Sequence, residues 1–355
     1  MAPADNPLSV GIAGAGIMGR LLAWQLQQVG CAVTLFDQDA IETGRAAAYT
    51  AAGMLAPYSE LESAESNIYQ LGQRSLQLWP ELVESLGAPE LFQQRGSLVV
   101  AHGQDVADLA HFKQLLTHKL PEQDGIEFLD RQGIAALEPA LAEQFDDAIY
   151  LDNESWVVTE ALLATLARKL KDNGAEWHPH CEVTGLEPGT IHAADGEHRF
   201  DWVADCRGLG ARADIPGLRG VRGEVIRVHA PEVKISRMVR LMHPRYRLYL
   251  VPNPDNHYLL GATQIESEDM SPISVRSALE LLSALYAIDP AFAEARIVET
   301  RSNCRPALMD NQPLVDAQDG LLVINGLYRH GYLLAPALAE QAQQTLLAPA
   351  QQATA

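Results

Sequence analysis

The apolar and polar positions are most regular at the start of the chain. Residues 8–14 form an apolar run that predicts a buried strand, and residues 17–30 repeat apolar positions at helical spacing and end in glycine. Residues 31–37 form a second apolar run, which predicts another buried strand. A strand, a helix and a strand in this order over about 30 residues are typical of a βαβ unit.

The rest of the chain alternates between helical and strand patterns. Helical periodicity predicts helices at residues 67–86, 106–120, 160–174 and 274–288. Strand patterns occur at residues 96–102, 176–188, 190–194 and 201–208, and they dominate from about 217 to 300. Residues 320–347 read as strand, glycine and helix, and residues 348–355 have little to bury, so we expect a frayed end. The order favours two interleaved, discontinuous domains.

Composition narrows the classes of partner. The chain has 355 residues, 47% of them apolar, and 46 acidic against 26 basic residues give a formal charge of −20. This charge disfavours nucleic acid and anionic membranes, since both attract basic surfaces. The N-terminal segment lacks the pattern of a signal peptide, and no apolar stretch approaches the roughly 18 residues of a membrane span. We therefore expect a cytoplasmic protein.

Cysteine and histidine positions predict no metal site. Cys31, Cys181, Cys206 and Cys304 show no CxxC spacing, which argues against both a zinc site and a disulfide framework. The 11 histidines are dispersed, and we interpret the run at residues 178–181 as strand ends rather than ligands. Free thiols and no metal are the expectation.

A glycine-rich turn carries the first chemical signal. Gly14, Gly16 and Gly19 form GxGxxG between the first strand and the first helix, and Asp37 ends the second strand. The first glycine permits a tight turn, the second lets backbone approach a pyrophosphate, and the third allows close helix–strand packing. A carboxylate at this distance is placed to bind ribose hydroxyls. The motif predicts a dinucleotide but does not separate NAD from FAD; the small-residue segment 44–60 would suit a chain lying against a ring.

A late arginine carries the second signal. Arg305 ends a predicted strand just before Pro306, in a chain with a large acidic excess. An arginine in such a place is suited to hold a small anion, because its planar guanidinium binds a carboxylate with two parallel hydrogen bonds. The alternative is a structural ion pair with Asp310 or Glu299.

Several motifs, in this order, resemble one family of flavoproteins. GxGxxG is followed by "AAGMLAP", "RGEVIRV", "YLVP", "LLGATQIE", "CRPALMDNQPL" and "GLYRHGYLLAP". Together they are similar to the D-amino-acid oxidase family, and within it to the glycine oxidases of thiamine biosynthesis. The resemblance covers nearly the whole chain. It implies an α/β (α+β overall) fold, in which a Rossmann-like FAD-binding domain is interleaved with a mostly antiparallel-sheet substrate domain. The corresponding segments are 1–85, 150–216 and 300–355 for the FAD-binding domain, and 86–149 and 217–299 for the substrate-binding domain.

The resemblance also implies an activity. Family members use non-covalent FAD to oxidise small amines or amino acids such as glycine, sarcosine and small D-amino acids. Hydride passes to the flavin, O₂ is reduced to H₂O₂, and the imine is hydrolysed to a 2-oxo acid plus ammonia or amine. No side-chain base is required, and we expect a homo-oligomer, a tetramer by family resemblance. Two alternatives stay open: a dehydrogenase of the same fold that reduces a quinone or carrier, and a non-catalytic flavin-binding subunit.

The resemblance assigns site residues one by one. For the substrate, Arg305 would grip the carboxylate, with Arg329 and Tyr249 beside it. For the cofactor, the pyrophosphate and ribose contacts would come from Gly14, Gly16, Ile17, Met18, Gly19, Asp37 and Gln38. The flavin side would be lined by Ala48, Tyr49, Ala52, Gly53 and Met54, and the adenine would meet the backbone of Val183. The ring would be wrapped by Leu327, Tyr328, Arg329, His330, Gly331, Tyr332 and Leu333, where a helix N-terminus would stabilise negative charge.

Overall fold

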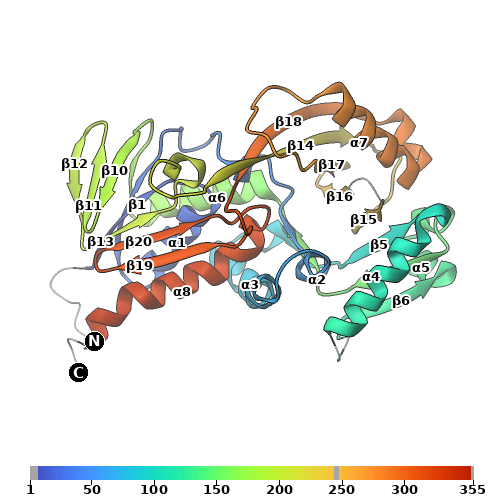
Figure 1. Cartoon of the computed structure of the whole chain (residues 1–355), viewed down its shortest axis with the longest axis horizontal. Helices are drawn as coiled ribbons and strands as arrows, with labels where there is room; N and C mark the ends of the chain where they lie inside the picture. Colours follow the sequence, from blue (N-terminus) through green and yellow to red (C-terminus); the bar gives the residue numbers. More distant parts are fainter. Residues whose placement is uncertain (1–6, 121, 123, 244–247, 353–355) are drawn as a thin grey trace.

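The computed structural model describes residues 7–120, 122, 124–243 and 248–352 and contains two large sheets (Figure 1). The final helix, α8 (Gly331–Gln352), runs into the segment expected to be frayed, whose last three residues lie outside the described part. None of the helices in the described residues combines the length and the apolarity needed to cross a membrane.

The first large sheet is the dinucleotide-binding type predicted from the opening βαβ unit. Its strand order is β19-β20-β13-β1-β2-β9, parallel except for β19 at one edge. The strands are β1 (Ser9–Ala13), β2 (Ala32–Phe36), β9 (Glu176–His178), β13 (Trp202–Asp205), β19 (Leu314–Gln318) and β20 (Leu321–Asn325). Chain segments separated by up to about 300 residues thus share one sheet, which is the discontinuity that the sequence predicts.

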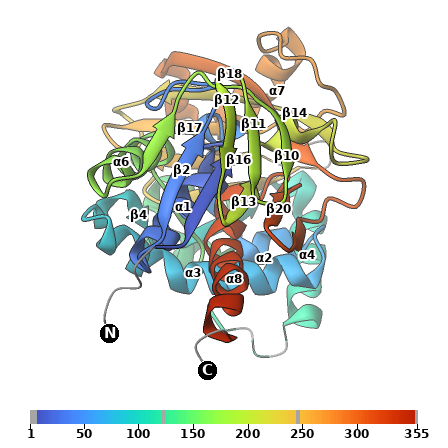
Figure 2. The ribbon, with the colours of Figure 1, turned by 90° about the vertical axis from the view of Figure 1, so that its left-hand side faces the viewer.

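Helices cover one face of this sheet and a small sheet covers the other. Helices α1 (Ile17–Gln28), α3 (Ser66–Ser85), α6 (Thr159–Asp172) and α8 share one apolar core with β1 and β20. On the opposite face lies an antiparallel sheet of β10 (Val183–Glu187), β11 (Thr190–Ala193) and β12 (Gly196–Arg199) (Figure 2). Gly11 in β1 permits this packing, because a side chain there would meet Phe200 and Ile191. Three layers result.

The second large sheet has eight strands in the order β18-β14-β17-β16-β15-β5-β7-β6 and is antiparallel except between β15 and β5. Its strands are β5 (Ser97–Ala101), β6 (Ile126–Asp130), β7 (Asp147–Leu151), β14 (Arg219–His229), β15 (Met238–Met242), β16 (Leu248–Asn253), β17 (His257–Gly261) and β18 (Arg296–Ala307). Helices α4 (Val106–Lys119), α5 (Arg131–Leu137) and α7 (Val275–Ile288) lie beside it (Figure 1). The two sheet types confirm the predicted fold class.

Shorter elements join the two sheets. A third small sheet contains β3 (Met54–Leu55), β8 (Ser155–Val157) and β4 (Phe92–Gln93), and α2 (Pro57–Glu60) follows β3. Short 3₁₀ helices occupy Ala47–Tyr49, Pro89–Leu91, Gly103–Asp105, Pro139–Leu141, Gly208–Ala211 and Pro290–Glu294. Strand β18 crosses residue 300, where the sequence prediction places a domain boundary, and the proposed division into two domains stays a prediction.

Candidate active site

A cavity of about 1420 Å³ lies at the carboxyl ends of the parallel strands and extends to the eight-stranded sheet. In open α/β sheets this edge is where ligands bind, because successive loops converge there. The cavity is lined by most of the residues that the resemblance assigns: Gly14, Gly16, Ile17, Met18, Asp37, Gln38, Ala48, Ala52, Gly53, Met54, Tyr249, Arg305 and Leu327 to Leu333. Three assigned residues, Gly19, Tyr49 and Val183, are not among its lining residues.

The glycine turn has the local geometry that its spacing predicts. Gly14 has φ +93°, and a Cβ atom there would lie 2.5 Å from the Cys206 carbonyl oxygen. A Cβ atom on Gly19 would collide with the Gly14 carbonyl oxygen, so Gly19 serves helix–strand packing rather than the cavity wall. Helix α1 starts after Gly16 without a side-chain cap and without acidic residues in its first turn. Its N–H groups and positive end therefore remain available for an anion.

Asp37 closes the nucleotide end of the cavity. Its carboxylate accepts hydrogen bonds from the Ala15 N–H at 2.5 Å and the Asp39 N–H at 2.8 Å, which leaves lone pairs for further donors. Burial raises the pKa of Asp37 from its usual value, and the two N–H donors partly oppose this rise. The Asp37 carboxylate therefore has two roles: it holds the glycine turn, and it faces the cavity.

A buried arginine that sequence reasoning missed supports this turn. Arg20 is 1% exposed and donates to the carbonyl oxygens of Ala15 at 2.7 Å, Leu163 at 2.6 Å and Ile41 at 2.9 Å. It also donates to the Tyr49 hydroxyl at 2.9 Å, which explains why Tyr49 lies behind the cavity wall. An arginine in an amphipathic helix carries no local signal of such a role, because its partners come from distant segments.

The residues at this end fit a dinucleotide cofactor. The turn is compact enough for backbone contact, the α1 N-terminus is uncapped, and a carboxylate stands at the end of β2. At the other end of the cavity, the Nδ1 atom of His330 is buried and has no hydrogen-bond partner among the described residues. FAD would supply partners at both ends: phosphate oxygens and ribose hydroxyls for the α1 N-terminus and Asp37, and the polar atoms of the flavin ring near His330.

Arg305 reaches the cavity from β18. Its guanidinium donates to the carbonyl oxygens of Arg222 at 3.3 Å and Thr263 at 3.1 Å. No carboxylate of the described residues lies within ion-pair distance of Arg305, and Glu299 instead pairs with Arg301 at 2.6 Å. Burial lowers the pKa of Arg305 from its usual value, a cost typical of a cation without a counter-charge. The guanidinium is therefore available to an anionic ligand.

A glycine makes room for this guanidinium. Gly223 lies in β14, which pairs with β18, and a Cβ atom there would meet the Arg305 guanidinium. The "RGE" motif at residues 222–224 thus reflects close packing between two strands. Any larger residue at this position would displace the arginine from the cavity.

Arg329 is in a different electrostatic state, because it has a carboxylate partner. Glu60 at the end of α2 accepts from Arg329 Nε at 2.9 Å and Nη2 at 2.5 Å, and from His330 Nε2 at 2.9 Å. Arg329 also donates to the Ser63 hydroxyl at 2.8 Å. Burial alone would raise the pKa of Glu60, but the charge of Arg329 and the His330 ring outweigh it and hold this pKa well below its usual value. Glu60 was not predicted from sequence.

A second charged pair lies deeper in the same wall. Arg240 in β15 is 1% exposed, forms an ion pair with Glu62, and lies over the Tyr249 ring at 5.9 Å. It also donates to the Ser59 carbonyl oxygen at 3.2 Å. Arg240 and Glu62 both line the cavity. Like Arg329, this arginine is neutralised within the protein, which leaves Arg305 as the cation with the weakest compensation of the three.

Beneath these pairs a buried carboxylate supports α2. Glu154 is fully buried and accepts from the Ser59 N–H at 2.7 Å, the Ser59 hydroxyl at 3.0 Å and the Ser97 hydroxyl at 2.5 Å. Burial raises the pKa of Glu154 to about 7, although these hydrogen bonds and the Arg240 charge oppose the rise. Glu154 positions Ser59, the residue before Glu60.

The start of α8 completes the wall. Tyr332 donates to the Ala48 carbonyl oxygen at 3.0 Å, which ties the last helix to the small-residue segment. Cys304 is 3% exposed and lies next to Arg305, and burial raises the pKa of its thiol. A buried, protonated thiol is a poor nucleophile. All four cysteines are free and buried.

The fold and the nucleotide end of the cavity are those of a dinucleotide-dependent enzyme. A model of the family described as FAD dependent oxidoreductase (DAO) matches residues 9–344. A Rhizobium etli protein whose name describes a thiamine biosynthesis oxidoreductase, ThiO, is 42% identical over 334 residues, 94% of this chain and 95% of its own length. The chain therefore belongs to the DAO family of FAD-dependent oxidoreductases.

Solved structures give the same assignment. A glycine oxidase from Geobacillus kaustophilus is 25% identical and superimposes with a TM-score of 0.83 over 96% of both chains. An iminodiacetate oxidase from Chelativorans sp. BNC1 is 26% identical, with a TM-score of 0.81 over 96% of this chain and 95% of its own. The predicted resemblance and fold are confirmed, and the chain is an FAD-dependent oxidoreductase of the glycine oxidase and ThiO type.

Proposed function

We propose that this chain is an FAD-dependent oxidase of small amino acids and amines, with glycine, sarcosine and small D-amino acids as substrates. The observation that carries the proposal is Arg305, a cavity-lining guanidinium that donates to two backbone carbonyl oxygens and has no carboxylate among the described residues within ion-pair distance. Such a group binds a substrate carboxylate by two parallel, charge-assisted hydrogen bonds and so orients the adjoining carbon.

Two other arginines of this wall, Arg329 and Arg240, favour a substrate with one carboxylate. Arg329 is paired with Glu60 and Arg240 with Glu62, so neither offers a full positive charge to a second anionic group. Tyr249 lies in the same wall and would restrict the length of a substrate side chain. Small size and a single carboxylate are the properties of glycine, sarcosine and alanine.

The protein's own groups bind and orient. Bound FAD would supply the hydride acceptor and would pass the electrons to O₂, which gives H₂O₂. The α1 N-terminus and Asp37 would hold its nucleotide half, and residues 327–333 its ring. No side-chain base is required if the amine enters neutral, and the resulting imine hydrolyses to a 2-oxo acid plus ammonia or amine. The buried Cys304 thiol supports non-covalent attachment of the cofactor, since a protonated thiol does not attack the ring.

A peroxide-coupled screen tests the activity. Purified holoenzyme would be supplied with glycine, sarcosine, D-alanine, D-phenylalanine and simple amines, and both H₂O₂ and the 2-oxo acid would be measured. We expect the highest kcat/KM for the small substrates that carry a carboxylate. Flavin reduction without peroxide, restored by an added quinone, would favour a dehydrogenase instead. Absence of flavin reduction by any amine would contradict both.

Two further properties follow from the same proposal. Acid precipitation should release the flavin into the supernatant, and flavin retained in the pellet would show a covalent link. The resemblance also implies a homo-oligomer, which we expect to be a tetramer. Size-exclusion chromatography with light scattering measures it directly.

A further inference from the structure

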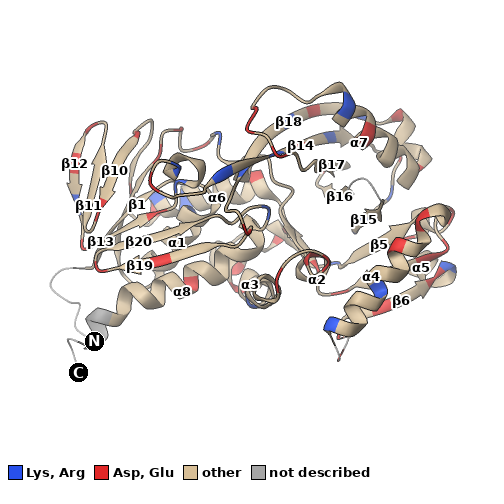
Figure 3. Cartoon of the chain, viewed as in Figure 1, with Lys and Arg blue, Asp and Glu red and all other residues tan. Residues whose placement is uncertain are grey.

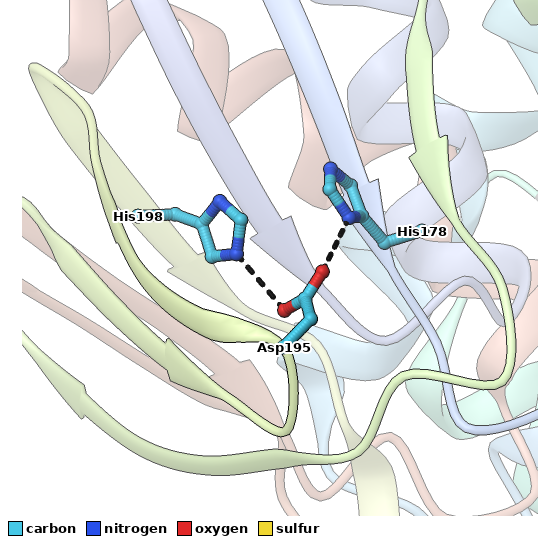
Figure 4. Close-up of side chains that lie close together, drawn as sticks. All are labelled: His178, Asp195 and His198. Carbon is cyan, nitrogen blue, oxygen red and sulfur yellow. Dashed lines mark hydrogen bonds and ion pairs between the residues drawn. The ribbon is translucent and has the colours of Figure 1, made fainter.

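Two turns at the edge of the small sheet bring four possible metal ligands together, away from the cavity. His178 ends β9, and Asp195 and His198 belong to the hairpin of β11 and β12 (Figure 4). Cys181 lies three residues after His178, in the turn that follows β9. Asp195 Oδ2 is 2.9 Å from His178 Nδ1, and Asp195 Oδ1 is 2.9 Å from His198 Nε2. The thiol of Cys181 is 3.3 Å from Asp195 Oδ1.

The spacing of these residues follows a pattern common in zinc sites. His178 and Cys181 enclose two residues, and so do Asp195 and His198. Two ligand pairs of this spacing, carried on two turns, are typical of structural zinc sites, and imidazole, thiolate and carboxylate are all zinc ligands. The sequence alone shows no CxxC pair, and only the fold places the second turn beside the first.

The two ring nitrogens of His178 face two different carboxylates. His178 Nε2 lies 3.2 Å from Glu176 Oε1, and the tautomer with its proton on Nε2 would donate to this carboxylate. In the neutral ring, Nδ1 then carries a lone pair, and that lone pair faces the Asp195 carboxylate at 2.9 Å. In this tautomer a metal ion between Nδ1 and the carboxylate would bind both groups. Glu176, on the other ring nitrogen, is the kind of partner that a metal-bound histidine usually has, because such a histidine donates its second N–H to a carboxylate.

We propose that His178, Asp195 and His198 hold a divalent metal ion of the zinc class, with the Cys181 thiol, 3.3 Å from Asp195 Oδ1, as the nearest candidate for a fourth ligand. The ligand atoms of His178, Asp195 and His198 all lie within 4.8 Å of one another. A tetrahedral zinc ion places its ligand atoms about 3.3–3.8 Å apart, given bond lengths of about 2.0–2.3 Å. The two 2.9 Å contacts of Asp195 would therefore lengthen by about 0.4 Å or more when the ion binds. Thiolate and carboxylate would balance the two positive charges, and four protein ligands leave no position for substrate.

The site would stabilise the nucleotide end of the cavity from behind. The Cys181 N–H donates to the Asp37 carbonyl oxygen at 2.8 Å, and the His180 N–H donates to the Asp39 carbonyl oxygen at 3.1 Å. The His178 ring stacks on Phe36, with centroids 4.5 Å apart and planes at 15°. A metal ion would thus fix the turn that supports the end of β2. It would do so whether or not the enzyme oxidises amino acids.

Metal content and metal affinity of the holoenzyme test this site. The protein would be dialysed against a chelator, reloaded with Zn²⁺, and examined by elemental analysis, titration calorimetry and X-ray absorption at the zinc edge. We expect one zinc per chain with nitrogen, oxygen and sulfur neighbours, and a higher melting temperature in the loaded form. Less than about one tenth of a zinc per chain after reloading would overturn the proposal.

Variants separate a built site from surface binding. His198→Ala should weaken zinc binding at least about 100-fold, and Glu176→Gln about 10- to 100-fold, the range for partners of metal-bound residues. Cys181→Ser should remove the sulfur neighbour from the absorption spectrum. His192→Ala is the control, because His192 lies in the same sheet, faces Glu187 at 3.6 Å and should leave zinc affinity unchanged. Equal affinity in His198→Ala and the parent would show that zinc binds elsewhere.

Discussion

The two ends of the cavity are built in different ways. The nucleotide end uses backbone groups and one carboxylate from a single segment, Gly14 to Asp37. The substrate end uses charged side chains from α2 and the turn after it, from β15 and β18, and from the turn before α8, which lie far apart in the chain. The nucleotide end depends on local conformation, whereas the substrate end depends on which charges are paired. Figure 3 shows where the charged residues lie along the fold.

The difference explains where specificity resides. A pyrophosphate and a ribose are the same in every member of a cofactor class, so backbone N–H groups suffice to bind them. Substrates differ by one charge or one methyl group. The substrate end sets its net charge by pairing Arg329 and Arg240 with carboxylates, whereas no carboxylate in the described part of the chain pairs with Arg305. Replacing Glu60 or Glu62 should therefore change the preference among substrates more than it changes the affinity for FAD.

The largest effect is expected at Arg305. Arg305→Leu should lower kcat/KM for glycine roughly 30- to 5000-fold, because the charge-assisted pair with the substrate carboxylate is lost. This corresponds to a loss of about 2–5 kcal/mol in transition-state stabilisation. Flavin content should not change, since the nucleotide end is untouched. Steady-state kinetics and flavin absorbance measure the two quantities.

Two control variants sharpen this test. Arg305→Lys should recover only part of the loss, because a point charge cannot reproduce the planar fork. Arg301→Leu alters the same strand at a side chain that does not line the cavity, so its kcat/KM should stay close to that of the parent. If Arg305→Leu keeps full activity on amino acids, the carboxylate is held elsewhere, with Arg329 the first residue to examine.

The opposite end should respond in cofactor affinity. Asp37→Ala should weaken FAD binding by about 1.5–3 kcal/mol, roughly 10- to 150-fold, because hydrogen bonds to a charged group are lost. Asp37→Asn keeps an acceptor oxygen and should lose less. Titration of apoprotein with FAD, followed by flavin fluorescence, gives the dissociation constant of each variant. An unchanged dissociation constant for Asp37→Ala would show that Asp37 does not contribute to FAD binding.

Glu154 should make stability depend on pH. Its pKa is raised to about 7 in the folded protein by burial, above the ordinary value of 4.5, so the folded state holds the proton more tightly than the unfolded chain. Its contribution to stability is therefore largest at low pH and falls as pH rises through about 4.5 to 7. Between pH 5 and pH 8 the loss should be about 1–3 kcal/mol.

Glu154→Gln should remove this part of the pH dependence. Urea unfolding of parent and variant at pH 5 and pH 8 would give two differences in the free energy of unfolding. We expect the parent to become less stable relative to the variant at pH 8. A difference that is the same at both pH values would show that Glu154 does not take up a proton on folding.

The smallest effect concerns Glu60. Glu60→Gln should leave Arg329 with an uncompensated charge and should favour an amine with two carboxylates, such as iminodiacetate, over glycine by one or two kcal/mol, a factor of about 5–30. The ratio of the two kcat/KM values measures it. Glu65→Gln removes the same charge from an exposed position nearby and should leave the ratio unchanged. An unchanged ratio in Glu60→Gln would mean that Arg329 does not face the substrate.

The sequence by itself determined the opening βαβ unit, the glycine turn and the position of Asp37. These features are local, because glycine spacing and apolar periodicity act within a few turns of one segment. The helices at 67–86, 106–120, 160–174 and 274–288 were predicted within a few residues for the same reason. The motifs around Arg305 and Arg329 were also recognisable, through their order along the chain.

Only the tertiary structure decided how these residues are paired. Nothing near Arg329 in the sequence marks Glu60, which lies 269 residues earlier, and nothing in α1 marks Arg20 as a buried link to α6. The same holds for Asp195, which meets His178 only because β9 and the β11–β12 hairpin lie side by side. Charge pairing acts through space over a few ångströms, so its partners are set by packing and not by distance along the chain.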